Sequence, residues 1–149
     1  MKPYNHPTMI QDKSKVDMAW LVGRKIASIE KLDFSWFFVF DDGSSIGTES
    51  PWRLLSTNGI VASSEDDGHS FGLPAPVNAA ERAIEIVLQN HISGFELRER
   101  TADLIIYLAN NTAIEVLNLS CGYDGWRAVH GKHEVFCLGG GRLAELHAD

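Results

Sequence analysis

The chain has 149 residues, of which 44% are hydrophobic, and this is enough for one globular domain with its own core. Acidic residues outnumber basic residues by 20 to 13, and the formal net charge of −7 argues against nucleic acid as a ligand, because nucleic-acid binding requires a basic surface. No run approaches the ~20 apolar residues of a membrane span, and no hydrophobic signal core stands at the N-terminus, so we expect a cytoplasmic protein without a membrane partner.

Residues 1–18 carry scattered charge and two prolines without any periodicity, which predicts a flexible N-terminal arm. A single α+β domain is expected over residues 19–149. Strands are expected over residues 24–32 and 36–40, and the second of these is apolar on both faces, which is typical of a central strand. A third strand follows the turn at Asp42-Gly43 and ends at Pro51 or lies at a sheet edge.

The middle of the chain predicts a short hairpin and the one helix. The hairpin joins residues 59–63 to residues 70–73 around an acidic turn, and a stiff, proline-containing connector follows. Asn78 and Glu81 have the spacing of a capping box, which predicts a helix over residues 79–90. Its apolar stripe is expected to face one sheet and consists of Ala80, Ala83, Ile84, Val87 and Leu88.

The last third of the chain predicts strands again. A strand at residues 95–98 precedes a hairpin around Asn110-Asn111, where asparagine tolerates the positive φ of a tight turn. A final hairpin joins residues 126–130 to residues 134–138. The three glycines at residues 139–141 lack the Lys-Ser/Thr of a phosphate loop and predict a bend or bulge. Cys121 and Cys137 lie in or beside strands, so we expect buried free thiols, with a disulfide between them as the alternative.

The two hairpin regions can be aligned with each other. Matching residues 42–46 to residues 110–114 places Phe38 on Ile106, and both copies then end in a Trp-Arg pair. We interpret this as a weak internal duplication, although any two hairpins share apolar runs around a turn. The predicted fold is therefore α+β: two antiparallel β-meanders around one central helix, as a curved sheet or a partly open barrel.

No residue pattern supports catalysis or metal binding. The acidic turn lacks the alternation of a calcium loop, and a solvated turn or an acidic contact surface is the preferred interpretation. His130 and His133 flank a tight turn with only Glu134 near them in the chain, which does not complete a zinc shell. We predict no catalytic residue, no metal site and no cofactor.

Three strings resemble an uncharacterised family of small bacterial β-rich proteins: DGHSFGLPAPV at residues 67–77, SCGYDGW at residues 120–126 and GGGRLA at residues 139–144. The resemblance covers residues 21–146 and implies a bacterial cytoplasmic domain without catalytic residues to carry over. The family pattern has a Glu before the Trp, where this chain has Asp124-Gly125, so no role of a carboxylate is transferred there.

The leading hypothesis is a small acidic protein-binding module of the immunity type, which neutralises a basic partner protein. The Trp-Arg strings at residues 52–53 and 126–127 allow a structural interpretation, in which each Trp caps the core and its Arg pairs with a nearby acid. They also allow a functional one, because Trp, Tyr and Arg dominate protein contact sites, and opposite charge speeds association. The candidate partner-binding residues are Glu65, Asp66, Asp67, His69, Trp52, Arg53, Tyr123, Asp124, Trp126 and Arg127.

Two alternatives remain. The first is a small-molecule binder or modest enzyme, whose pocket between sheet and helix is lined by Trp36, Phe38 and Tyr107. The second is a structural homodimer formed through an exposed strand edge.

Overall fold

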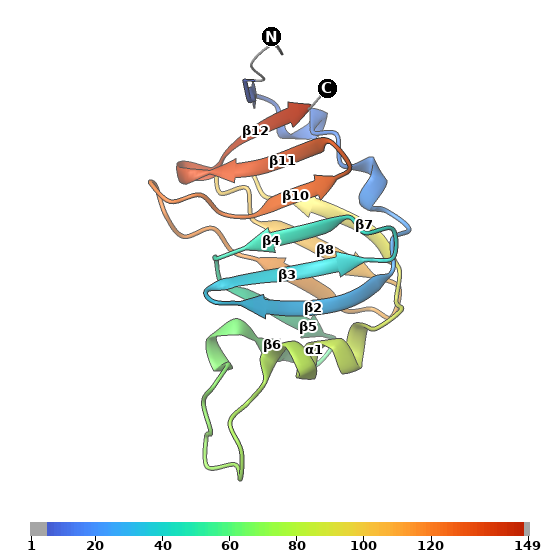
Figure 1. Cartoon of the computed structure of the whole chain (residues 1–149), viewed down its shortest axis with the longest axis vertical. Helices are drawn as coiled ribbons and strands as arrows, with labels where there is room; N and C mark the ends of the chain where they lie inside the picture. Colours follow the sequence, from blue (N-terminus) through green and yellow to red (C-terminus); the bar gives the residue numbers. More distant parts are fainter. Residues whose placement is uncertain (1–5, 148–149) are drawn as a thin grey trace.

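The protein is a two-layer structure of antiparallel sheets, seen in a computed structural model that describes residues 6–147 (Figure 1). The seven-stranded sheet has the order β1 (Thr8–Ile10), β12 (Arg142–His147), β11 (His133–Leu138), β10 (Arg127–His130), β4 (Ser45–Thr48), β3 (Ser35–Phe40) and β2 (Ile26–Leu32). The five-stranded sheet has the order β6 (Gly59–Ser63), β5 (Trp52–Ser56), β9 (Ala113–Val116), β8 (Leu104–Leu108) and β7 (Ile92–Leu97). One apolar core lies between the two sheets.

The helix α1 (Ala79–Val87) lies at the side of this sandwich and not at its centre. It packs against β2 and β6, which are edge strands of the two sheets. The expectation of a central helix inside a curved sheet or barrel was therefore wrong. The physical reason is size: the helix ends at Val87, and only Ala79, Ala83 and Val87 on it are buried, so its apolar stripe is too narrow to cover a sheet face.

The N-terminal segment closes the opposite side. Thr8–Ile10 pairs with β12, Met18 and Leu21 are fully buried, and the 3₁₀ turn η2 (Ala19–Leu21) contacts β7. Residues 6–18 of the predicted flexible arm thus contribute a strand and a core residue, because their apolar side chains fill the open end of the sandwich. Residues 1–5 of that arm, and residues 148–149 of the predicted domain, lie outside the described residues.

The two halves of the chain exchange strands between the sheets. The meander β2–β3–β4 lies in the seven-stranded sheet and continues into β5 and β6 of the other sheet, whereas β7–β8–β9 lies in the five-stranded sheet and continues into β10 and β11. The seams between the halves are the pairs β4–β10 and β5–β9. Two meanders are therefore present, as expected.

Matching positions of the two halves also occupy matching registers. Phe38 is opposite Ile46 in the first meander, and Ile106 is opposite Ile114 in the second. The edge strands β2 and β7 each carry a bulge near their start, and in both turns a hydroxyl group donates to the side chain two residues earlier. Two similar hairpins within one sandwich can also share these features, so the duplication stays a prediction.

Some of the local predictions are confirmed and others are wrong. Asn111 has the expected positive φ, and Gly43, in the other predicted turn, has a positive φ as well. The predicted hairpin between residues 59–63 and 70–73 is wrong, because β6 pairs with β5 and the later segment forms a projecting loop closed by hydrogen bonds between Gly68, His69 and Val77.

Both cysteines are free, as expected, but Cys121 is exposed. Burial raises the pKa of the Cys137 thiol to about 11, so this thiol is protonated at neutral pH.

The three glycines form the expected bend, the 3₁₀ turn η4 (Gly139–Gly141). Backbone atoms of other segments lie close to Gly139 and Gly141. Gly141 has a φ of +80°, and a Cβ atom there would clash with the Arg100 carbonyl oxygen. Gly131 also has a positive φ, +59°, but a Cβ atom there would meet nothing within 4 Å.

We expect Gly141→Ala to lower the free energy of unfolding more than Gly131→Ala does. The backbone penalty of a left-handed residue, about 1 kcal/mol, is common to both variants. Only Gly141→Ala adds the clash with Arg100, which should cost about 2 to 3 kcal/mol more. Urea unfolding followed by circular dichroism measures both, and equal losses would contradict the assigned contact.

Candidate binding surface

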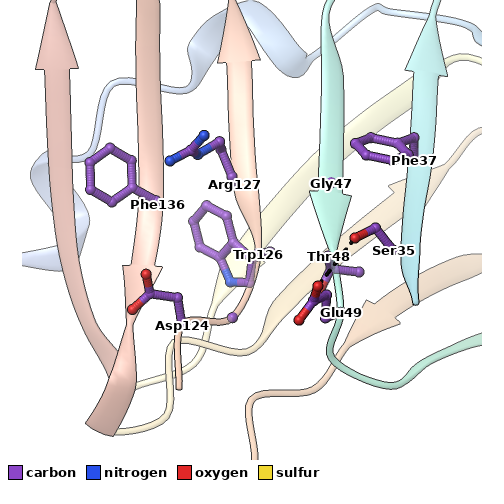
Figure 2. Close-up of a pocket in the computed structure, with 10 residues that line it drawn as sticks. Ser35, Phe37, Gly47, Thr48, Glu49, Asp124, Trp126, Arg127 and Phe136 are labelled. Carbon is purple, nitrogen blue, oxygen red and sulfur yellow. Dashed lines mark hydrogen bonds between the residues drawn. The ribbon is translucent and has the colours of Figure 1, made fainter. Parts of the chain in front are cut away.

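A groove lies on the outer face of the seven-stranded sheet, at the seam where β4 meets β10 (Figure 2). Its upper part has a volume of about 290 Å³ and lies between the ring of Phe37 and the side chains of Arg127 and Phe136. Gly47 lies beneath Phe37, and a Cβ atom on this glycine would be 3.0 Å from the ring. The hollow exists because the residue opposite Arg127 in the register is a glycine.

The lower part of the groove, about 300 Å³, shares Glu49, Asp124 and Gly125 with the upper part. Leu119 and Tyr123 lie beside it with 76% and 85% of their surfaces exposed. We call the two parts together the seam groove; it is lined chiefly by Phe37, Glu49, Leu119, Tyr123, Asp124, Arg127 and Phe136.

The loop that carries Leu119 and Tyr123 is fixed by hydrogen bonds. Asn118 donates from its side-chain amide to the Ala102 and Thr101 carbonyls at 2.7 and 3.0 Å. Ser120 Oγ accepts from the backbone N–H groups of Gly122 and Tyr123 at 3.0 and 2.9 Å. The exposed apolar side chains are therefore presented by an ordered backbone, which lowers the entropic cost of binding through them.

Within residues 6–147, no cationic side chain pairs with Glu49 or Asp124, the two carboxylates of the seam groove. Glu49 accepts a hydrogen bond from Ser35 Oγ at 3.4 Å, and Asp124 has no hydrogen bond or ion pair with any other residue in the described part of the chain. Arg127 lies over the Phe136 ring at 5.4 Å, and its Nε is 3.8 Å from a Glu134 oxygen. Two unpaired carboxylates and one loosely paired guanidinium thus share the groove.

The second seam has the same register but is closed. Arg53 is opposite Glu115 on β9, just as Arg127 is opposite Gly47 on β4. Glu115 accepts from Arg53 Nε at 2.7 Å and from Arg98 at 2.8 Å, and its side chain is only 5% exposed. The charged groups of this seam are paired with one another. Arg53 therefore stabilises the sheet and does not line the seam groove.

Of the predicted partner-binding residues, the structure brings Tyr123, Asp124, Trp126 and Arg127 together at the seam groove. The indoles of Trp126 and Trp52, however, are 0% and 1% exposed. Trp126 donates to the Ala102 carbonyl at 2.8 Å, and Trp52 packs edge-on against Trp36 and Phe38. Neither indole can therefore be the expected surface anchor, and the exposed ring at the groove is that of Tyr123.

The acidic turn is not part of this groove: it lies beside the helix and the start of β5, where Ser64 forms hydrogen bonds with the Trp52 backbone. Glu65 and Asp66 are in the 3₁₀ turn η3 (Ser64–Asp66), and His69 is exposed near the Phe71 ring. Asp67 stabilises the local structure, because its carboxylate is 2.9 Å from Lys31 Nζ and accepts from the Ala79 N–H, at the start of α1, at 2.9 Å. Burial alone would raise the pKa of Asp67, but this hydrogen bond and the Lys31 ammonium outweigh it and lower the pKa below 3.8.

The three aromatic residues of the alternative pocket do not line a common cavity. Trp36 and Phe38 are buried in the core, where their rings lie 5.2 and 5.3 Å from Trp52. Tyr107 is 41% exposed and donates to Glu96 at 2.8 Å. The pocket that the small-molecule alternative expects between these three residues is therefore not formed, and Tyr107 lines a separate hollow of about 430 Å³ with neither Trp36 nor Phe38 in its wall.

Sequence reasoning missed several groove residues: Phe37, Glu49, Leu119 and Phe136. It also missed that His133 meets Glu145 and His147 on β12. Glu134, the expected neighbour, lies on the other face with Arg127, and His130 stacks on Trp20 at 4.8 Å. The available signal was the spacing of Glu145 and His147, because residues two apart on a strand share a face.

No protein-family model matches the chain, and no significant match was found among curated proteins or among solved structures. The resemblance to a bacterial family stays a prediction. Among the described residues no helix is long and apolar enough to cross a membrane.

We expect Asp67→Asn to lower the free energy of unfolding by about 1 to 2 kcal/mol near neutral pH, because the charged partner of Lys31 and of the helix N-terminus is lost. The pKa of Asp67 is lower in the folded state, so its contribution is complete above pH 3.8 and disappears as the pH falls through the folded value.

The difference between wild type and Asp67→Asn should therefore narrow below about pH 4 in urea unfolding series. Glu65→Gln is the control, with an expected change within about 0.5 kcal/mol at either pH. A difference that persists unchanged in acid would show that the Asp67 charge is not its source.

Proposed function

We propose that the protein is a small acidic binding module that docks a basic segment of a partner protein in the seam groove. The observation that carries this proposal is the pairing of two cation-free carboxylates, Glu49 and Asp124, with two exposed apolar side chains, Leu119 and Tyr123. An apolar anchor beside unpaired charge is the composition of a protein contact site.

The negative charge of the protein and of its groove favours a basic partner. The chain has a net charge of −7, and a lysine or arginine entering the groove would meet carboxylates that need not release a cation first. Opposite charge would also speed encounter and make it sensitive to salt. An immunity-type role in the cytoplasm, with a basic protein as its target, is consistent with this chemistry and is the function we favour.

The acidic turn is a weaker candidate for the contact. Asp67 is already used by Lys31 and α1. This leaves Glu65 and Asp66, and the exposed ring nearest to them in the chain, Phe71, packs against His69. We also propose that the chain arose by duplication of one unit, supported by the equivalent registers at Phe38 and Ile106. Under that proposal, the equivalent positions Gly47 and Glu115 diverged after the duplication, and the groove lies at the seam that carries the glycine.

The test is capture of partners from a lysate of the native host, followed by titration of the purified partner. We expect Tyr123→Ala to weaken binding roughly 30-fold, which corresponds to the loss of about 2 kcal/mol typical of an aromatic anchor. Asp124→Asn should reduce the association rate and flatten its salt dependence. Both substituted side chains are exposed, so circular dichroism melts should remain unchanged.

The matched control is Glu65→Gln, which removes one exposed carboxylate of the acidic turn and leaves the groove intact. Binding that survives Tyr123→Ala and Asp124→Asn but fails with Glu65→Gln would move the site to the acidic turn. Binding that does not respond to salt would refute a charge-led contact altogether.

A further inference from the structure

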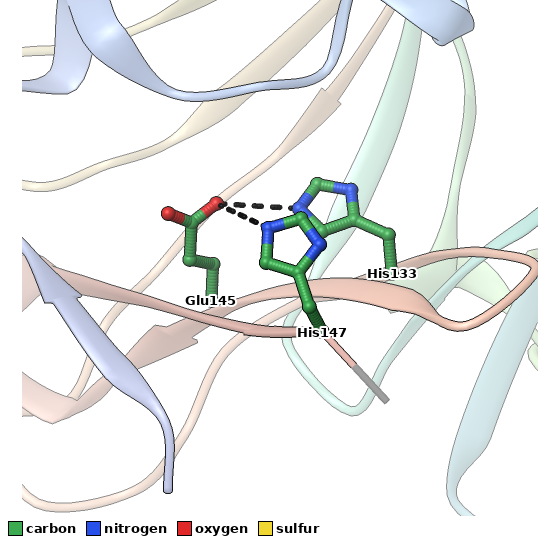
Figure 3. Close-up of side chains that lie close together, drawn as sticks. All are labelled: His133, Glu145 and His147. Atoms are coloured by element: carbon green, nitrogen blue, oxygen red, sulfur yellow. Dashed lines mark hydrogen bonds and ion pairs between the residues drawn. The ribbon is translucent and has the colours of Figure 1, made fainter. Parts of the chain in front are cut away.

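We propose that His133, Glu145 and His147 form a binding site for a divalent transition-metal ion of the zinc class (Figure 3). The three side chains lie at the end of the β11–β12 pair, and one ligand atom from each lies within 4.8 Å of the others. This cluster is separate from the seam groove, and the proposal does not depend on the binding function.

Strand register brings the three residues together. His133 on β11 is directly opposite His147 on β12, and Glu145 precedes His147 by two residues, so it lies on the same face. That face is the inner one, because Val135 and Leu143 follow the same alternation into the core. The register of the two paired strands thus fixes the backbone positions of all three ligand residues.

The distances fit a shared ion. Glu145 Oε2 is 3.2 Å from His133 Nε2 and 3.6 Å from His147 Nε2. Ligand atoms about 2.0 to 2.2 Å from a tetrahedral zinc ion are roughly 3.3 to 3.6 Å from one another, so these separations are those of neighbouring ligands. Both imidazoles turn the same edge toward one carboxylate oxygen, and their rings are stacked 4.2 Å apart.

Only a small movement of the side chains would bring the three ligand atoms to coordination distance from one ion. The His147 side chain is 64% exposed and can rotate, whereas the His133 side chain is 12% exposed and held in place. Two imidazoles and one carboxylate are a ligand set that zinc prefers, and the three residues leave a fourth position for water or another donor. The ion would tie the last residue of β12 to β11, next to β1, which pairs with Glu145 through Thr8.

The experiment uses the full chain without a histidine tag. Zn²⁺ titration by calorimetry should give one ion per chain, and Co²⁺ should give the strong visible absorption of tetrahedral coordination. His147→Ala and Glu145→Gln should each weaken Zn²⁺ binding by more than about 10-fold, because loss of a direct ligand should cost at least as much as loss of an outer partner. Zn²⁺ should also raise the thermal midpoint of the wild type and not that of His147→Ala.

His69→Ala is the matched control, since it removes an exposed histidine elsewhere on the surface. Glu145→Gln keeps the size of the side chain, so it separates loss of a ligand from loss of the fold. Wild-type affinity in both His147→Ala and Glu145→Gln would overturn the proposal. Equal loss in His69→Ala would also overturn it, because the binding would then be nonspecific.

Discussion

The strand exchange between the two halves is the constraint on which the rest of the structure depends. Each three-stranded meander is completed by a hairpin from the other half, through the β4–β10 and β5–β9 pairs. The hairpins β5–β6 and β10–β11 would each be marginal alone, because an isolated two-stranded hairpin is barely stable in water. Exchange gives each sheet enough strands to cover the other, and Trp52 and Trp126, which follow the crossings, fill the core between them.

The two seams show how one backbone arrangement supports two different surfaces. Where Arg53 faces Glu115, the charges are paired and the Glu115 carboxylate is buried, so no groove forms between the two residues. Where Arg127 faces Gly47, no side chain reaches the guanidinium across the seam, and the space is open. The groove is thus the result of one missing carboxylate at one register position, and the carboxylates that line it, Glu49 and Asp124, lie in the segments after β4 and before β10.

Much of the local structure was predictable, because strand periodicity and turn residues such as Gly43 and Asn111 act over a few positions. The position of α1 was not predictable. An amphipathic stripe indicates that one face of a helix packs against another element, but it does not identify that element. For Trp52 and Trp126 the expectation that each indole caps the core is confirmed and that of a surface anchor is wrong. The Trp-Arg string is the same for a buried and an exposed indole, so it could not decide between them. The seam groove depends on the pairing of β4 with β10, which are distant in the sequence, and no local pattern encodes that pairing. The His133 cluster needs only the register of the consecutive strands β11 and β12, which the sequence does not specify.

Strand β11 serves both proposed sites, and its alternation keeps them apart. Phe136 points outward to the groove and His133 points inward to Glu145, because successive side chains on a strand face opposite ways. A substitution at one site therefore leaves the side chains of the other in place. An ion at His133 would still stiffen the same strand that forms one wall of the groove. Coupling between the two sites, if measured, would have to pass through the β11 backbone, since no side chain is shared between them.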